Sequence, residues 1–268
     1  MANSAAFFDL DRTLISGASA FPFGIEAWRQ GLASNEDVRR WVIAAVSFKI
    51  LGDKGDNSEE IKGDFLSRSE GASVRAMEGV GTAVMPKLVS RVRPEARRLI
   101  EMHHEAGRDT WIVSASPYEI VEPFARTLGM TGAIATRGRV VAGHYTGELD
   151  GPFVYGKGKA EAIDKLTADR GYDLDRSYAY SDSVSDLPMM EMVGHPVAVN
   201  PDSELDRVAH ERGWPIVIFA RKTKRAIALG AMGTAGAAFT ASAYALGRRH
   251  GRAGAMAKVA EKQISGRT

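Results

Sequence analysis

The chain has 268 residues, of which 44% are hydrophobic and 25% are charged, a composition typical of a globular protein that buries a large core. It contains no cysteine, which excludes disulfide bonds and thiolate metal sites. The first residues show no charged segment followed by an apolar run, so we expect no signal peptide and a cytoplasmic location.

Charge is divided unevenly along the chain. Residues 219–268 contain ten Lys or Arg and one Glu, a net charge of +9, whereas the full chain has 35 bases and 33 acids. The first 218 residues therefore hold 25 bases and 32 acids, a net charge of −7. This division indicates that the C-terminal part has its own partner, with anionic lipid and nucleic acid as candidates. Of these two candidate partners, nucleic acid is not expected to be bound specifically.

The first predicted strand spans residues 6–9 and opens into two aspartates, Asp9 and Asp11. Side chains two residues apart on an extended chain point the same way, so both carboxylates can share one pocket. Neighbouring carboxylates repel each other unless a cation lies between them, and Mg²⁺ suits such oxygens. The alternative interpretation is a strand followed by a polar turn.

Residues 18–92 show helical periodicity and no strand alternation. Helix start signals at 34–37 (Ser-Asn-Glu-Asp) and 58–60 (Ser-Glu-Glu) precede apolar residues at helical spacing. We therefore predict a helical cap over 18–92, inserted after the first strand into a catalytic core made of residues 1–17 and 93–219.

Strands and helices alternate in the rest of the core. Strands are predicted at 110–113, 133–136, 177–181, 196–199 and 215–219, with a hairpin at 139–147, and helices at 94–107, 117–128, 157–170, 185–192 and 203–212. The alternation predicts an α/β fold, a Rossmann-like doubly wound parallel sheet with helices on both faces.

Polar and charged residues stand at the ends of three predicted strands and at the start of one helix. In chain order they are Asp9 and Asp11, Ser114, Lys157 or Lys159, and Asp182 with Asp186. Ligands of open α/β sheets bind beyond the carboxyl ends of the strands, so we expect these side chains to converge.

The four groups together resemble the motifs of the haloacid dehalogenase superfamily of aspartyl-phosphate hydrolases. The resemblance covers roughly residues 5 to 219 and is closest to the phosphoserine-phosphatase-like branch, which has a helical cap between the first two motifs. The residues that carry it are 9–14 (Asp-Leu-Asp-Arg-Thr-Leu), 113–117 (Val-Ser-Ala-Ser-Pro), 156–159 (Gly-Lys-Gly-Lys) and 180–186 (Tyr-Ser-Asp-Ser-Val-Ser-Asp).

Phosphomonoester hydrolysis gives each residue a candidate role. Asp9 fits the nucleophile, because an ionised carboxylate needs no base to activate it. Asp11 fits the general acid that protonates the leaving oxygen and later activates water. The resemblance implies in addition that Asp9, the backbone carbonyl of Asp11 and Asp182 hold Mg²⁺. It also implies that Ser114 and Lys159 bind the phosphoryl group.

Alternatives stay open for three assignments. Ser114 also suits a serine that caps the following helix. Asp186, predicted to support Lys159 or to touch the metal through water, also suits the negative charge preferred at a helix start. Lys157 competes with Lys159, which is favoured because the run Lys-Ala-Glu-Ala-Ile matches the lysine-led helix of the family better.

Departures from the family bear on the substrate. True phosphoserine phosphatases carry a cap glutamate seven residues after the second aspartate of the first motif, where this chain has Ala18. The second motif reads Ser-Ala-Ser-Pro rather than Ser-Gly-Gly. Both departures argue against L-phosphoserine as the main substrate.

Residues 226–247 form a stretch of 22 residues without a charge, rich in Ala and Gly and flanked by basic clusters. Its length fits a bilayer-spanning helix, and its small residues suit close helix packing. We predict that the basic tail 220–268 associates with a membrane through helix 226–247. The alternative is a helix packed on the globular body or on a second subunit of a homodimer.

The sequence thus predicts a Mg²⁺-dependent phosphomonoester hydrolase that forms an aspartyl-phosphate and acts on a lipid or small-metabolite phosphate at the cytoplasmic face of a membrane. A soluble phosphoserine-type phosphatase is one alternative. A non-catalytic, membrane-tethered regulator is another, and the complete set of motif residues argues against it.

Overall fold

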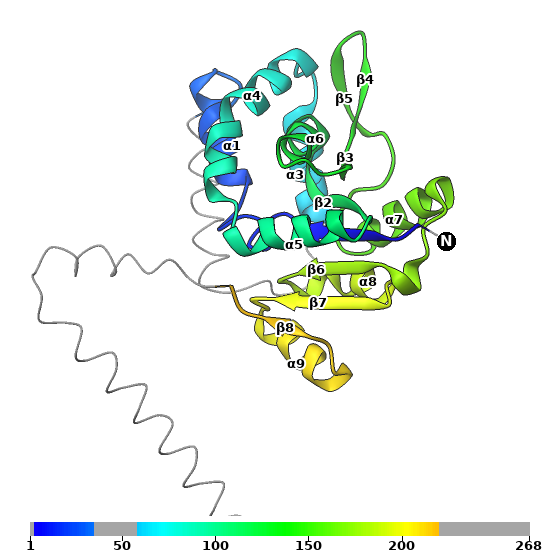
Figure 1. Ribbon diagram of the computed structural model, residues 1–268. Helices are drawn as coiled ribbons and strands as arrows, with labels where there is room; N and C mark the ends of the chain where they lie inside the picture. The colour runs from blue at the N-terminus through cyan, green and yellow to red at the C-terminus, as the bar shows by residue number, and fades with distance from the viewer. Residues whose placement is uncertain (1–2, 35–57, 220–268) are drawn as a thin grey trace, which may run out of the picture. The chain divides into compact units, whose positions relative to one another are not determined.

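A computed structural model of the chain describes residues 3–34 and 58–219. Its centre is a six-stranded parallel sheet with the strand order β3-β2-β1-β6-β7-β8 (Figure 1). The strands are β1 Ala5–Asp9, β2 Asp109–Pro117, β3 Gly132–Thr136, β6 Tyr178–Ser181, β7 His195–Val199 and β8 Ile216–Val217. Because β1 pairs in parallel with both β2 and β6, the carboxyl ends of these three strands meet at one edge.

Helices cover both faces of the sheet. They are α5 Pro94–Glu105 and α6 Tyr118–Thr127 on one face, and α7 Lys157–Arg170, α8 Leu187–Glu191 and α9 Ser203–Arg212 on the other. Successive side chains of β1 point to opposite faces of the sheet, and each face has its own hydrophobic core. Ala6 and Phe8 pack with α5 and α6, whereas Ala5 and Phe7 pack with the other three helices. The predicted doubly wound α/β sheet is confirmed.

Three described helices fall within the range predicted for the cap. They are α1 Ala20–Arg29, α3 Ser58–Ser69 and α4 Val74–Arg91. The two segments that connect this range to the sheet run side by side, since the Ser16 N–H donates to the Arg91 carbonyl at 2.9 Å and the Arg93 N–H to the Leu14 carbonyl at 3.0 Å. The boundaries of the cap stay a prediction, and the proposed helix start at 34–37 lies mostly outside the described residues.

A hairpin of β4 Gly138–Val141 and β5 His144–Leu149 extends from the core to these helices (Figure 1). The Tyr145 N–H donates to the Ala72 carbonyl at 3.0 Å, and the Gly71 N–H donates to the Tyr145 carbonyl at 2.9 Å. The hairpin therefore pairs with the turn between α3 and α4 and joins the cap range to the core.

Some elements differ in extent from their predictions. The predicted helix 185–192 starts as a 3-10 turn, Val184–Asp186, before α8. A continuous α-helix from 184 would need an N–H from Pro188 for the Val184 carbonyl, and proline has none. Strand β2 continues to Pro117 with an irregular register after Ser114, and β8 is shorter than predicted.

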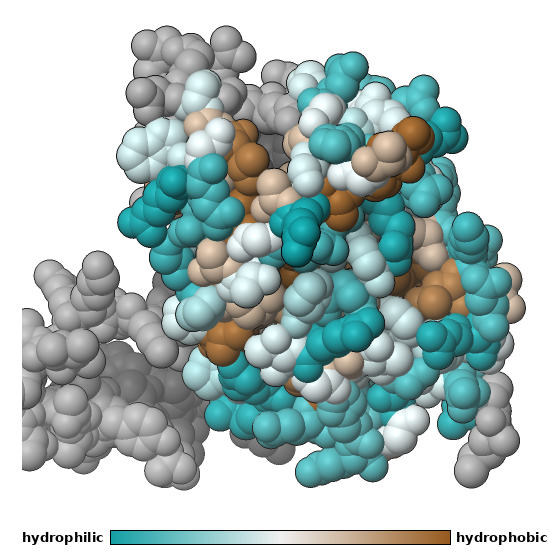
Figure 2. Space-filling model, turned by 90° about the horizontal axis from the view of Figure 1, so that it is seen from above, coloured by the Kyte–Doolittle hydropathy of each residue, from teal (hydrophilic) through white to brown (hydrophobic). Residues whose placement is uncertain are grey.

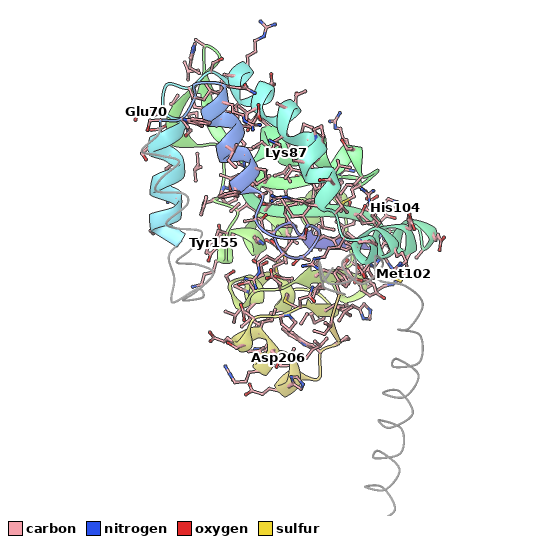
Figure 3. All side chains as sticks on the ribbon, turned by 90° about the vertical axis from the view of Figure 1, so that its left-hand side faces the viewer. Glu70, Lys87, Met102, His104, Tyr155 and Asp206 are labelled. Atoms are coloured by element: carbon pink, nitrogen blue, oxygen red, sulfur yellow. The ribbon has the colours of Figure 1, made fainter. Side chains whose placement is uncertain are left out.

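The surface shown in Figure 2 is mostly hydrophilic, with hydrophobic side chains in separate areas rather than in one patch. In Figure 3, Asp206 of α9 lies near the end of the described part that is away from Glu70 and Lys87. Within residues 3–34 and 58–219, no helix combines the length and apolar character that crossing a membrane requires. The predicted membrane helix 226–247 lies outside these ranges, so membrane association stays a prediction.

Candidate active site

The carboxyl end of β1 carries Asp9, which contacts Lys159 from the first turn of α7. The Lys159 Nζ lies 2.6 Å from the Asp9 Oδ1 and 2.8 Å from the Asp186 Oδ2. Asp186 also accepts a hydrogen bond from the Ser181 hydroxyl at 2.6 Å. All four residues are buried, so one ammonium group is enclosed between two carboxylates.

Burial and charge pairing determine the ionisation of this group. Burial raises the pKa of Asp9 well above its ordinary value, and the ammonium of Lys159 opposes that rise. Burial lowers the pKa of Lys159, but the carboxylates of Asp186 and Asp9 outweigh it and hold this pKa above its ordinary value. Lys159 therefore keeps its charge at neutral pH and favours the ionised Asp9 that a nucleophile requires.

The start of α7 distinguishes the two candidate lysines. Lys159 is buried against Asp9, whereas Lys157 is exposed to solvent. Between them, a Cβ added to Gly158 would meet the Phe153 carbonyl oxygen at 1.9 Å, so only glycine fits this close approach. The structure thus brings Lys159, and not Lys157, to the carboxyl edge of the sheet.

Asp11 is held by Ser19, the residue that precedes α1. The Ser19 N–H donates to the Asp11 Oδ1 at 2.5 Å, and the Ser19 hydroxyl donates to the Oδ2 at 3.0 Å. Burial raises the pKa of the Asp11 carboxyl, while the two hydrogen bonds from Ser19 oppose the rise. A raised pKa favours a carboxyl that can hold a proton, which a general acid needs.

Asp182 directly follows β6 and faces the turn after Asp11. The Arg12 Nε lies 3.1 Å from the Asp182 Oδ2, and the Thr13 hydroxyl donates to the Oδ1 at 3.4 Å. Arg12 reaches this position with a φ of 62°, which is uncommon for a residue other than glycine. Burial raises the pKa of Asp182 to about 7, and the charge of Arg12 opposes the rise.

A magnesium ion fits the chemistry of these oxygens. The Asp182 Oδ2 is buried and accepts no hydrogen bond, although the Arg12 guanidinium is near, and a hard cation prefers such an oxygen. Among the described residues, no three His, Cys, Asp or Glu side chains cluster closely enough to hold a metal by themselves. The predicted set of Asp9, Asp182 and the Asp11 carbonyl would therefore need water or substrate oxygens as further ligands, as is usual for Mg²⁺.

Ser114 lies at the same edge, at the end of the regular part of β2. It is buried, and its Oγ accepts the N–H of Ser116 at 3.2 Å. A hydroxyl that accepts at its oxygen keeps its proton for another partner, which suits the predicted donation to a phosphoryl oxygen.

Several residues that shape the site were not predicted from the sequence, among them Ser19, Ser116 and Asp202. Ser19 contacts Asp11, and its hydroxyl oxygen lies 3.0 Å from that of Ser116. Asp202 holds the loop after β6, since its N–H donates to the Asp182 carbonyl at 2.7 Å and its Oδ2 accepts the Val184 N–H at 2.9 Å. Ser19 and Asp202 each precede a helix, a local signal that sequence can supply, whereas their contacts depend on the tertiary fold.

Comparison with known proteins agrees with this geometry. The sequence profile of a family described as haloacid dehalogenase-like hydrolase matches residues 6–191. The phosphoserine phosphatase SerB1 of Mycobacterium tuberculosis strain H37Rv is 39% identical over 244 residues, which cover 88% of this chain and 79% of that protein.

Solved structures share the fold. A protein of unknown function from Bordetella pertussis matches with a TM-score of 0.70 at 27% identity, covering 81% of this chain and 99% of that one. A phosphoserine phosphatase, described as a phospho-aspartyl intermediate analogue, matches with a TM-score of 0.59 at 19% identity over 82% and 95% of the two chains. The resemblance inferred from the four motifs is confirmed, and the chain belongs to the haloacid dehalogenase-like hydrolases, as a phosphatase of the phosphoserine-phosphatase-like branch.

Proposed function

We propose that the chain hydrolyses phosphomonoesters through an aspartyl-phosphate formed on Asp9, with Mg²⁺ as cofactor. The observation that carries this proposal is the buried ion pair, in which the Asp9 Oδ1 lies 2.6 Å from the Lys159 Nζ at the end of the central strand. An ionised carboxylate at this place can attack phosphorus, and the adjacent ammonium counters the charge of the phosphoryl oxygens.

The reaction then proceeds in two balanced steps. An oxygen of Asp9 attacks phosphorus, the bond from phosphorus to the leaving oxygen breaks, and Asp11 gives its proton to that oxygen, which leaves as an alcohol. Asp11 next takes a proton from a water molecule whose oxygen attacks the phosphorus on Asp9. The bond to Asp9 breaks, inorganic phosphate leaves, and both aspartates return to their first state.

Other residues stabilise charge during both steps. Ser114 and Lys159 bind the phosphoryl oxygens, and Asp186 keeps the ammonium of Lys159 in place. Mg²⁺, when held by Asp9, Asp182 and the Asp11 carbonyl, supplies positive charge to the same oxygens.

The proposed substrate is a phosphorylated small molecule or the phosphate head group of a lipid. Ala18, next to the Ser19 that holds Asp11, offers no carboxylate to a substrate ammonium. This disfavours phosphoserine, although SerB1 is named a phosphoserine phosphatase. Action at the cytoplasmic face of a membrane belongs to the same hypothesis and depends on the tail beyond residue 219.

The test is phosphate release by the full-length chain from a panel of soluble and lipid phosphomonoesters, with Mg²⁺ and with a chelator. Acid quenching and peptide mapping should find the phosphoryl group on Asp9, and metal-dependent turnover of at least one ester is expected. Asp9→Asn should lose the label and at least about a hundredfold of activity, equivalent to about 2.7 kcal/mol of barrier.

Two results would count against this proposal. Turnover by Asp9→Asn at the wild-type rate would exclude Asp9 as the nucleophile. A chain that hydrolyses no ester in the panel, while remaining folded and binding Mg²⁺, would favour the non-catalytic regulator.

A further inference from the structure

Two serines from different parts of the chain meet beside Asp11. Ser19 precedes α1 within the predicted cap range, and Ser116 belongs to the irregular end of β2 in the core. Their hydroxyl oxygens lie 3.0 Å apart, although the residues are 97 positions apart in sequence. A side chain of the core thus contacts the residue of the cap range that holds Asp11.

The number of available protons determines the direction of this contact. The Ser19 hydroxyl has one proton, which it donates to the Asp11 Oδ2 at 3.0 Å. The proton between the two serines must therefore come from Ser116, with the Ser19 oxygen as acceptor. Donation runs from Ser116 to Ser19 to Asp11, and consecutive hydrogen bonds of this kind strengthen one another.

Ser116 also touches the residue predicted to bind phosphate. Its backbone N–H donates to the Ser114 Oγ at 3.2 Å, while its hydroxyl faces Ser19. Ser116 thus contacts both Ser114, which is predicted to donate a hydrogen bond to the phosphoryl group, and Ser19, which holds Asp11. The position of the proposed acid is therefore linked to the predicted phosphate-binding site.

We propose that Ser116 is a positioning residue for Asp11, which it orients through the Ser19 hydroxyl. The inference rests on the proposed role of Asp11 as general acid. A carboxyl group has about four acceptor positions, of which Ser19 fills two, so the others are left for the proton that the leaving group receives. Because Ser19 lies in the predicted cap range and Ser116 in the core, the orientation of Asp11 then includes a contact between these two parts.

Esters with different leaving groups test this role. We expect Ser116→Ala to lower kcat for an alkyl phosphate by about tenfold with little change in KM, equivalent to about 1.4 kcal/mol of barrier. Hydrolysis of 4-nitrophenyl phosphate should change by less than about twofold, because its leaving group needs little protonation. Ser116→Thr keeps the hydroxyl and should restore the alkyl phosphate rate.

Two further variants serve as controls. Ser90→Ala removes a serine of α4 whose hydroxyl donates only within the helix, to the Lys87 carbonyl at 2.8 Å, and should leave both rates unchanged. Ser19→Ala should give the same selective loss as Ser116→Ala, which keeps the proposal testable if one of the two variants folds poorly. Circular dichroism of each variant checks the fold.

The Asp11→Asn background separates this inference from the proposed function. If Ser116 acts through Asp11, Ser116→Ala should cause no further loss of the alkyl phosphate rate in that background. Equal losses on both esters, or no loss, from Ser116→Ala would overturn the positioning role alone. Equal losses on both esters from Asp11→Asn would contradict the general-acid role, and the positioning role would fall with it.

Discussion

Among the described residues, the ammonium group of Lys159 forms ion pairs with both Asp9 and Asp186. Both carboxylates are buried, so neither can be solvated if that charge is lost. Breaking a buried pair by removing one partner costs about 3–5 kcal/mol, because the remaining charge is left uncompensated. The stability of the site and its proposed chemistry therefore depend on the same side chain.

The variant Lys159→Met should lower the free energy of unfolding by about 3–5 kcal/mol and kcat/KM by at least about a hundredfold. Lys157→Met is the matched control, since it removes an exposed lysine from the same helical turn. It should change stability by no more than about 0.5 kcal/mol. Urea unfolding and phosphate release measure both effects, and equal losses from the two variants would contradict the choice of Lys159.

At the residue scale, sequence reasoning located the charged groups but not the hydroxyls that orient them. Aspartates and a lysine at strand ends and a helix start are local signals, and the parallel sheet brings them together without further information. The contact between Ser19 and Ser116 depends on how the cap range meets the core, which no local pattern encodes. The pairing of Arg12 with Asp182 was missed for the same reason.

Element α5 is joined to β6 through a buried histidine. The His103 Nε2 lies 2.8 Å from the Tyr180 hydroxyl, and the Arg108 Nη1 lies 3.3 Å from the His103 Nδ1. Arginine has no lone pair to offer, so Nδ1 accepts and the neutral ring donates to Tyr180 from Nε2. Burial lowers the pKa of His103 to about 4, and the charge of Arg108 contributes to the decrease.

This histidine predicts a pH dependence of stability. Its pKa is about 4 in the folded chain and about 6.5 in the unfolded chain, so the unfolded chain binds more protons between these values. The free energy of unfolding should therefore fall as pH decreases from about 6.5 to about 4, with a contribution of about 3 kcal/mol from His103. His103→Gln should remove this part of the slope in urea titrations. Identical slopes for the wild type and His103→Gln would refute the assignment.

Packing between α4 and α6 depends on a glycine. A Cβ at Gly81 would lie 2.9 Å from the Glu119 carbonyl oxygen of α6, whereas a Cβ at Gly79 would have only the flexible Gln30 side chain nearby, at 3.5 Å. Gly81→Ala should destabilise the fold by about 1–2 kcal/mol, because the two helices must separate. Gly79→Ala should stabilise it by up to about 1 kcal/mol through helix propensity. Thermal unfolding of the pair measures the difference, and stabilisation by both changes would show that α4 is free to shift.

At the element scale, predicted and observed helix bounds agree where the sequence carries a clear signal for the end of a helix. Helices 157–170 and 203–212 match their predictions because each ends at a glycine with left-handed φ, Gly171 and Gly213. The 3-10 turn before α8 departs from the predicted helix because Pro188 has no N–H to donate to the Val184 carbonyl. The extension of β2 depends on pairing with β3, which is a tertiary contact.

For the molecule as a whole, the contacts divide the chain after Phe219. All residues of the proposed active site precede this point, whereas the excess of positive charge follows it. The proposed chemistry and the predicted membrane attachment therefore belong to separate parts of the chain. Removal of the second part should leave turnover of soluble esters unchanged.

Full-length protein should sediment with vesicles that contain anionic lipid, and a chain truncated after Phe219 should stay in the supernatant with its phosphatase activity intact. The basic clusters at 221–225 and 248–252 should each contribute attraction, on the order of 1 kcal/mol per residue near the surface. High salt should release the protein if only these clusters bind, because it screens exposed charges, but not if 226–247 inserts. Full-length protein that stays in the supernatant at low salt would reject membrane attachment. A doubled molar mass in light scattering, lost on truncation, would then identify the tail as a dimerisation segment.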